Sequence, residues 1–438
     1  MFSKLSVFLS ALSLVAASSI PHDGRAPHEH NVRSSLPSRW YHDDDHPAHA
    51  LFRRQSTTTN SSDGFPEVGT PTWAAAYPSN SADVNSLPQA WKDALDAAVK
   101  AGQIPNIPVG KQSSPGADPS YGSLDPNGAE VCSTTVQCRP PGVIWDAPDG
   151  VLGLSFDDGP LPPSDGLYAF LRQQQLHATH FFIGTNILQN PKEFLTAFQV
   201  NQDDIAVHTW THPYMTTLTN EQLLGEFGWT MQIIYNSTGG RLPRYWRPPY
   251  GDSDNRVIAI AKEVFGLTTV IWNQDTNDWS LGESGGTNAG AIQNNFKKWL
   301  AGPKSPGLII LEHELSNGSV NAFMQGYPLM TQNGWQIESV ARLQGLAPYW
   351  NAQNSSEPVI SAGLLAGGQN GTAIQTSTSA PASSAAQSAP TSSASSGSST
   401  SSGNNANQSK SSGAVATGVT SFSIVASTLG LMLGLILA

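Results

Sequence analysis

The sequence predicts an α/β fold in which parallel strands, covered by helices, form a distorted, incomplete (β/α) barrel. Between residues 140 and 350, short apolar runs alternate with stretches of helical spacing, which is typical of parallel strands joined by helices. These roughly 200 residues are too few for a complete eightfold barrel of about 250 residues. Carboxylates and imidazoles directly follow several of the apolar runs. This pattern predicts a site at the carboxyl ends of the strands.

Each expected element follows from a local pattern. Strands are expected at short apolar runs that end at Gly, Pro or polar residues, and helices where apolar residues recur every three or four positions. The expected strands are 151–157, 179–183, 205–209, 267–272 and 308–312. The expected helices are 167–175, 220–235, 257–264, 289–300 and 336–343.

The expected strand 151–157 ends on two adjacent carboxylates, Asp157 and Asp158, which Gly159 and Pro160 follow as a break. Adjacent residues on a strand point to opposite sides, so the two acids are expected to have different roles. The alternative is an Asp-Asp-Gly turn whose carboxylates only accept hydrogen bonds from nearby backbone amides.

The amino-terminal residues read as processed segments. Residues 1–19 have a basic residue, an apolar run and small residues, the pattern of a cleaved secretory signal. Residues 20–54 hold six of the eleven histidines, contain few apolar residues and end on Arg53-Arg54. We interpret them as a disordered propeptide that does not pack and is removed at this dibasic pair; loose metal binding is the alternative.

An extension at 55–139 precedes the region of alternating strands and helices. One helix is expected from Ser86 to Gly102, where Trp91 and Leu95 have helical spacing. Cys132 and Cys138, the two cysteines of the chain, predict a small local disulfide in a secreted protein.

The carboxyl-terminal residues read as a stalk and an anchor signal. Residues 351–412 become rich in Ser and Thr and predict a disordered stalk, and the small residues and apolar tail of 413–438 predict a removed GPI signal with attachment at Ser412. A single membrane-spanning helix is the alternative. Six glycosylation sequons corroborate secretion: Asn60, Asn236, Asn317, Asn354, Asn370 and Asn407. We therefore expect a cell-surface protein on the plasma membrane and in the cell wall, partly secreted, and monomeric.

The formal charge of -11 and a pI of about 5.4 argue against nucleic acid as a partner. A charged fraction of only 13% also fits tails that do not fold.

His208 and His212 follow the expected strand 205–209 and offer two imidazoles at one rim. With Asp158 they would make a two-His, one-Asp metal site; two unrelated loop histidines are the alternative. Further along, Arg247 lies in a stiff Pro-Pro turn suited to holding a carboxylate, and His313 follows the last apolar strand.

These motifs, in this order over about residues 140–350, resemble the polysaccharide deacetylase family, carbohydrate esterase family four with its NodB-like domain, and most of all GPI-anchored fungal chitin deacetylases. The resemblance implies one divalent metal, zinc or another ion such as cobalt, on Asp158, His208 and His212. It also implies a general base and acid with supporting residues: Asp157 as base, Arg247 orienting it, Tyr250 offering an oxyanion-hole amide, His313 as acid, Asp278 tuning it, and Trp279, Leu311 and Tyr250 binding substrate.

The implied activity is hydrolysis of N-acetyl groups of chitin, with chitin oligomers as substrates and wall glucan or membrane lipid as anchor partners. Two residues depart from the family pattern: Ser155 replaces a frequent Thr, and Glu314 replaces a frequent Asp, which leaves hydrogen bonding around His313 open. The alternatives are an acetylxylan or other O-acetyl esterase, a non-haem iron oxygenase, and a non-catalytic chitin-binding wall protein.

Overall fold

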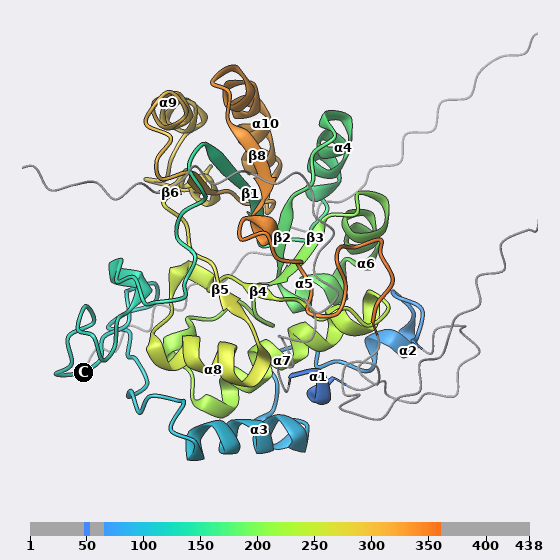
Figure 1. Cartoon of the computed structure of the whole chain (residues 1–438), viewed down its shortest axis with the longest axis vertical. Coiled ribbons are helices and arrows are strands. Elements are labelled where there is room, and N and C mark those ends of the chain that lie inside the picture. Colours follow the sequence, from blue (N-terminus) through green and yellow to red (C-terminus); the bar gives the residue numbers. More distant parts are fainter. Residues whose placement is uncertain (1–47, 53–64, 361–438) are drawn as a thin grey trace, which may run out of the picture. The chain divides into compact units, whose positions relative to one another are not determined.

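A parallel sheet organises the chain (Figure 1). The computed structural model describes residues 48–52 and 65–360, and every structural statement below concerns these residues. The hydrogen-bonded strand order is β5-β4-β3-β2-β1-β7-β6, and β8 also pairs with β1. The strands are β1 (Val151–Asp157), β2 (Thr179–Phe182), β3 (Asp204–Val207), β4 (Tyr245–Trp246), β5 (Thr268–Thr269), β6 (Gln274–Asp275), β7 (Leu308–Leu311) and β8 (Gln336–Ser339). All pairings between them are parallel, and the path does not close, which confirms the incomplete barrel.

Strand β1 is the centre of the sheet. Its carboxyl-terminal half pairs with β2, and its amino-terminal half pairs with β7 and β8. Six of its seven residues are buried. Both faces of β1 are covered, so the strand reads as a nearly continuous apolar run rather than an alternating one.

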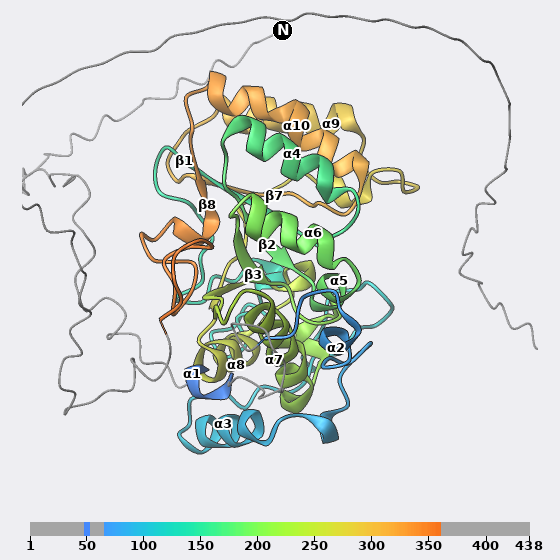
Figure 2. The same cartoon turned by 90° about the vertical axis from the view of Figure 1, so that its right-hand side faces the viewer.

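Helices cover the sheet on both sides (Figures 1 and 2). On one side α9 and α4 pack against α10, and on the other α7 packs against α8. Local signals set their ends: Thr219 forms a capping box at the start of α7, and Gly266 ends α8 with a left-handed backbone (φ 69°). The helices are α4 (Ser164–Gln174), α5 (Gly184–Gln189), α6 (Pro191–Leu195), α7 (Asn220–Ser237), α8 (Asn255–Phe265), α9 (Ala289–Leu300) and α10 (Asn317–Gln332).

One expected helix is wrong, one expected strand is much shorter, and the helices α5, α6 and α10 were missed. Residues 336–343 were expected to be a helix, but they form β8 and a 3-10 turn because Gln336–Ser339 pairs with the start of β1. The expected strand 267–272 is reduced to Thr268–Thr269, since β4, its partner, is equally short. Helix α10 was missed because it contains Pro328 and two glycines, which weaken a helical pattern.

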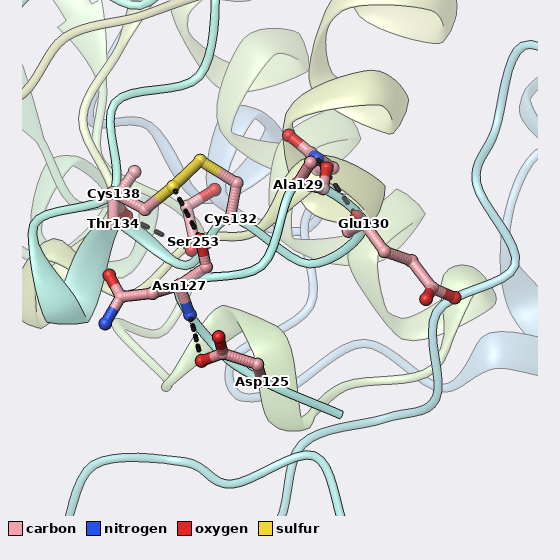
Figure 3. The surroundings of a disulfide bond; sticks show 9 residues. Asp125, Asn127, Ala129, Glu130, Cys132, Thr134, Cys138 and Ser253 are labelled. Atoms are coloured by element: carbon pink, nitrogen blue, oxygen red, sulfur yellow. Dashed lines mark hydrogen bonds between the residues drawn. A yellow bond between two sulfur atoms is a disulfide. The ribbon is translucent and has the colours of Figure 1, made fainter. Parts of the chain in front are cut away.

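The extension packs on the sheet domain instead of standing apart. Its helix α3 (Gln89–Lys100) confirms the expected helix, with a start three residues later, and lies against α7 and α8. The ring of Trp91 is fully buried and leaves no room for a Cβ at Gly228 of α7. A short helix α2 (Pro71–Ala74) precedes it, and the predicted disulfide between Cys132 and Cys138 is present, with a Cα–Cα distance of 5.1 Å (Figure 3).

The expectation that residues 20–54 do not pack is wrong for their last part. Helix α1 (Ala48–Leu51) leads to Phe52, which is 2% exposed and joins the core. The Phe52 ring lies 5.9 Å from Trp91, 6.3 Å from Tyr235 and 6.3 Å from Phe265 between centroids. The polar composition of the leader gave no indication that Phe52 would be buried.

Several predictions fall outside the described residues. They are the signal at 1–19, most of the leader, the stalk beyond residue 360, Asn60, Asn370, Asn407, and the anchor signal with Ser412. Between residues 48 and 52 and between 65 and 360, no helix is long and apolar enough to cross a membrane.

Candidate active site and metal centre

The predicted site residues converge at the carboxyl ends of β1, β3 and β7. Backbone hydrogen bonds fix the end of β1 against the segment after β7: the Asp157 amide donates to the Glu312 carbonyl (3.0 Å), and the Glu314 amide donates to the Asp157 carbonyl (3.1 Å). The Arg247 amide donates to the Val207 carbonyl at the end of β3 (3.0 Å). Because the strands are parallel, their ends share one edge, and residues far apart in sequence meet there.

Asp158, His208 and His212 form a candidate metal centre. Asp158 Oδ1 lies 3.2 Å from the Nε2 atoms of both histidines, and the three ligand atoms lie within 4.8 Å of one another. Asp158 and His212 both have left-handed backbones, with φ of 71° and 62°, which turn the two side chains toward the same point.

His208 can present its Nε2 atom to a cation at this point. Its Nδ1 lies 2.7 Å from the Arg247 carbonyl, which can only accept, so Nδ1 carries a proton and the neutral ring has its lone pair on Nε2. Nε2 lies 3.2 Å from Asp158 Oδ1, and this pair is favourable across a shared proton or across a bound cation. Two nitrogens with one oxygen suit a borderline divalent ion.

Burial alone would raise the pKa of Asp158, but contacts with His208, His212 and His313 outweigh it and hold the pKa well below its usual value. The carboxyl is therefore ionised, as a metal ligand must be.

Asp157 has different partners from its neighbour. Its Oδ1 accepts a hydrogen bond from Arg247 Nη1 (2.6 Å), and Arg247 Nη2 donates to Ser155 Oγ (3.0 Å). Arg247 is fully buried, with its guanidinium over the Phe181 ring at 4.2 Å. Asp157 Oδ2 lies 4.0 Å from His208 Nε2, so this oxygen faces the metal centre. The geometry predicted for Asp157 and Arg247 is present, and Ser155 supplies the hydroxyl that receives the second guanidinium bond.

His313 is held by Asp278. His313 Nδ1 lies 2.6 Å from Asp278 Oδ1, and the His313 amide donates to Asp278 Oδ2 (2.9 Å). Burial would lower the pKa of His313, but Asp278, followed by Asp158 and Asp157, raises it to about 10. His313 Nε2 points toward the metal centre and lies 4.0 Å from Asp158 Oδ2. Asp278 therefore favours the protonated imidazole, whose Nε2–H can donate at the site.

Three predicted substrate-binding residues lie on segments that carry or adjoin other site residues. Tyr250 has a left-handed backbone (φ 58°, ψ 11°), and its half-exposed ring lies over Tyr214, with 4.1 Å between centroids and 7° between planes. Trp279 is 46% exposed on the 3-10 turn that also carries Asp278. Leu311 is buried at the end of β7. The roles of Trp279 and Leu311 in an acetyl pocket stay predictions.

Comparisons with known proteins identify the family of this chain. A family model described as polysaccharide deacetylase matches residues 146–270. Chitin deacetylase 3 of Cryptococcus neoformans var. neoformans is 38% identical over 366 residues, which cover 82% of this chain and 82% of that protein. The chain belongs to the polysaccharide deacetylase family.

Other members of this family are also similar. The chitin deacetylase of Amylomyces rouxii is 39% identical over 204 residues, covering 45% of this chain and 47% of that protein. Among solved structures, the chitin deacetylase of Colletotrichum lindemuthianum matches with 24% identity, a TM-score of 0.43 and coverage of 48% of this chain and 96% of that one. A family 4 carbohydrate esterase from Streptomyces lividans, in complex with acetate, has 32% identity, a TM-score of 0.37 and coverage of 44% and 93%.

The departure of this polysaccharide deacetylase at Glu314 is resolved by a buried partner that the sequence analysis missed. Glu314 Oε1 lies 2.7 Å from His180 Nδ1, and His180 Nε2 lies 3.1 Å from Asp203 Oδ2, with all three side chains fully buried. Burial lowers the pKa of His180, but the two acids outweigh it and raise the pKa to about 10. The Glu314 carboxyl also leaves no room for a Cβ at Gly159. The only signal in the sequence was an imidazole, His180, inside the mainly apolar strand 179–183.

The predicted glycosylation of Asn236 conflicts with the fold. Asn236 is 7% exposed within α7, and its Nδ2 donates to the Tyr77 hydroxyl (2.9 Å), so no glycan fits on that nitrogen. A sequon identifies an asparagine that could accept a glycan, but it does not indicate whether that side chain is buried. Asn317 is exposed at the start of α10 and Asn354 is partly exposed, so both stay candidates.

Proposed function

We propose that this polysaccharide deacetylase hydrolyses N-acetyl groups of chitin and releases acetate and chitosan. One observation carries the proposal: three residues that could hold a metal lie between a carboxylate outside that group, Asp157, and the imidazole of His313. The names of the similar chitin deacetylases supply the substrate class.

Asp157 is the general base. Because Arg247 occupies Oδ1, the free Oδ2 that faces the metal centre takes the proton of the attacking water. The bond from Arg247 fixes the rotation of the carboxylate, and the hydroxyl of Ser155 fixes Arg247 in turn.

His313 is the general acid. Asp278 holds the proton on Nδ1, so Nε2 donates its own proton to the nitrogen of the leaving amine. The amide of Tyr250 donates to the oxyanion that develops on the acetyl carbonyl. The rings of Tyr250 and Trp279 are exposed, and we propose that they offer apolar faces to sugar rings.

Asp158, His208 and His212 would hold the metal ion, which we propose is zinc or another divalent ion such as cobalt. When bound, such an ion lowers the pKa of water and polarises a carbonyl oxygen. The facial triad of iron oxygenases uses the same ligand types, but Asp157, Arg247 and His313 have no required place in that chemistry.

The test is acetate release by the purified secreted chain from chitin oligomers and, in parallel, from acetylated xylan, with and without a chelator. Chelator-sensitive release from chitin oligomers is expected. Release from xylan alone would identify an O-acetyl esterase. Chitin binding without acetate release would identify a wall-binding protein, and oxygen consumption an oxygenase.

We also propose that the protein is held at the cell surface by a GPI anchor at or near Ser412. The support is the sequence of residues 413–438, with small residues, a short spacer and an apolar tail without following charge. Membrane lipid and wall glucan would be its partners there.

A further inference from the structure

The turn that carries Tyr250 has an unfavourable backbone. Tyr250 lies at φ 58° and ψ 11°, a left-handed conformation that is unfavourable for a residue with a Cβ. Pro248 and Pro249 precede it, and Gly251 follows with φ 65°. Such a conformation persists only where the surroundings fix it. The direction of the Tyr250 amide therefore depends on what holds this turn.

Part of the support comes from the extension, more than a hundred residues earlier in the chain. Thr134 is buried, and its hydroxyl donates to the Gly251 carbonyl at 2.6 Å, directly after Tyr250. The Thr134 amide donates to the Ser253 carbonyl at 2.9 Å (Figure 3). Two hydrogen bonds from one residue therefore fix the carbonyls on the carboxyl side of Tyr250.

The next residue of the extension joins the turn to the metal centre. Thr135 Oγ1 donates to Asp252 Oδ1 at 3.1 Å, and the buried Asp252 accepts from both the amide and the hydroxyl of Thr216 at 2.9 Å. Thr216 lies four residues after His212. Asp252 therefore connects three segments. It belongs to the Tyr250 turn, it is bonded to Thr135 of the extension, and it is bonded to Thr216 in the segment after the proposed metal ligand His212.

The supporting loop is itself fixed at both ends. The disulfide between Cys132 and Cys138 closes it around the short 3-10 turn Thr134–Val136. On its amino-terminal side, the Asn255 amide donates to the Val131 carbonyl at 3.0 Å, and Asn255 Nδ2 donates to two further carbonyls of the extension. The disulfide-closed loop 132–138 therefore contacts residues 251–253, and the residues just before it, 129–131, contact Asn255.

We infer that the disulfide-closed loop 132–138 positions the oxyanion-stabilising turn, with Thr134 and Thr135 as positioning residues for catalysis. The inference rests on the proposed function, because the Tyr250 amide matters only if an oxyanion forms. A displacement of about 1 Å in a catalytic group can cost about a hundredfold in rate. The extension is then a part of the active site, although none of its residues needs to touch the substrate.

The experiment compares Thr134→Val with Thr134→Ser in the full secreted chain. The first removes the hydroxyl at nearly constant volume, and the second keeps it. For Thr134→Val, we expect kcat to fall about 10- to 100-fold, with KM and bound metal unchanged. The loss should be equal on chitin oligomers and on an activated aryl acetate, since both reactions form an oxyanion. Thr134→Ser should restore kcat, and the double variant Cys132→Ser/Cys138→Ser should lower it.

Thr238→Val is the matched control. It removes another buried hydroxyl, which donates to the Ile234 carbonyl at 2.7 Å at the end of α7. If Thr134→Val and Thr238→Val change kcat equally, or if neither changes it, the inference is wrong. Amide hydrogen exchange of residues 250–253 gives a second measure that needs no activity. Faster exchange in Thr134→Val than in Thr238→Val is expected, even if the wild-type chain releases no acetate and the proposed function fails.

Discussion

Asp157 and Asp158 are neighbours whose carboxylates have different partners. Asp157 is bound by Arg247, whereas Asp158 faces two imidazoles. Asp157→Asn should therefore keep the bound metal but abolish acetate release, and Asp158→Asn should lose metal and activity together. Metal content and acetate release of the two purified variants check this, each variant serving as the control for the other. Equal loss of metal from both would contradict the separate roles.

Metal binding by the two imidazoles can be tested directly. His208→Ala or His212→Ala should remove both bound metal and activity, because each deletes one of three ligands. Elemental analysis of the purified variants measures this. Stoichiometric metal with normal turnover in His212→Ala would show that the ligand set is different.

His313 is expected to act on the leaving group. An amine leaves poorly unless it is protonated, so His313→Ala should lower turnover of chitin oligomers by roughly 10² to 10⁴ and affect an activated aryl acetate much less. Asp278 raises the pKa of His313, whose charged form is the donor. Asp278→Asn should therefore lower this pKa and shift the alkaline limb of the pH–rate profile to lower pH, without loss of metal. Equal losses on amide and ester in His313→Ala would indicate a structural role.

The acids Asp157 and Asp158 and the imidazoles of His208 and His313 could be predicted from the sequence because they lie at or just after the ends of apolar strands, whereas Tyr250 and several others were implied only by the family resemblance. Parallel strands bring such positions to one edge whatever their distance along the chain. His180 could not be predicted in this way. Its partners Asp203 and Glu314 are remote in sequence, and nothing local indicates that Glu314 turns to a buried imidazole instead of the His313 ring.

At the scale of elements, the His180 cluster connects β2, the residue before β3 and the segment after β7. His180→Phe would leave two buried carboxyls without their partner and should reduce the free energy of unfolding by about 3–5 kcal/mol. His177→Ala is the control, since His177 is more than half exposed and lies 3.7 Å from Asp203. Urea unfolding of the two variants measures the contrast. Similar small losses in both would mean that the cluster contributes little.

The pH dependence of the contribution of the His180 cluster to stability follows from the pKa shifts of His180 and Asp203. The folded pKa of His180 is raised from 6.5 to about 10, so its stabilisation is complete below about pH 6.5 and is lost as pH rises through about 10. The pKa of Asp203, which burial alone would raise, is lowered by the two histidines from 3.8 to about 2, so its stabilisation is lost as pH falls through about 2. The difference between wild type and His180→Phe should therefore be largest between about pH 4 and 6.5.

The elements that were predicted wrongly depend on long-range pairing. Gln336–Ser339 becomes a strand because the start of β1 offers a free edge, and the sequence around it has weak preferences of its own. Residues 151–157 were predicted well because burial on both faces of the strand gives a continuous apolar run. Residues 220–235 were predicted well because the start of this helix has the local sequence pattern of a capping box.

At the scale of the whole molecule, the proposed GPI anchor predicts where the enzyme is found. Truncation before Ser411 should release active protein into the medium, because the attachment signal is lost. Western blotting of medium and cell-wall fractions, with acetate release from each, measures this, and the full-length chain is the control. Finding residues 422–438 in the mature protein by mass spectrometry would contradict the anchor.

The packing of Phe52 bears on whether the leader is removed from the mature protein. Phe52 lies just before Arg53-Arg54, the dibasic pair at which the leader is expected to be cut. Its ring is 2% exposed among Trp91, Tyr235 and Phe265, so it supports the extension and the sheet domain together. If the secreted protein retains this segment, Phe52→Ala should lower the free energy of unfolding by about 3–5 kcal/mol through the cavity that it leaves. Leu51→Ala, at a half-buried neighbour, should cost clearly less. Denaturant unfolding of the secreted variants measures the loss of stability, and their intact mass shows whether the segment with Phe52 is retained. A mature chain that begins after Arg54, without bound leader, and whose stability is unaffected by Phe52→Ala would show that this packing is absent from the working enzyme.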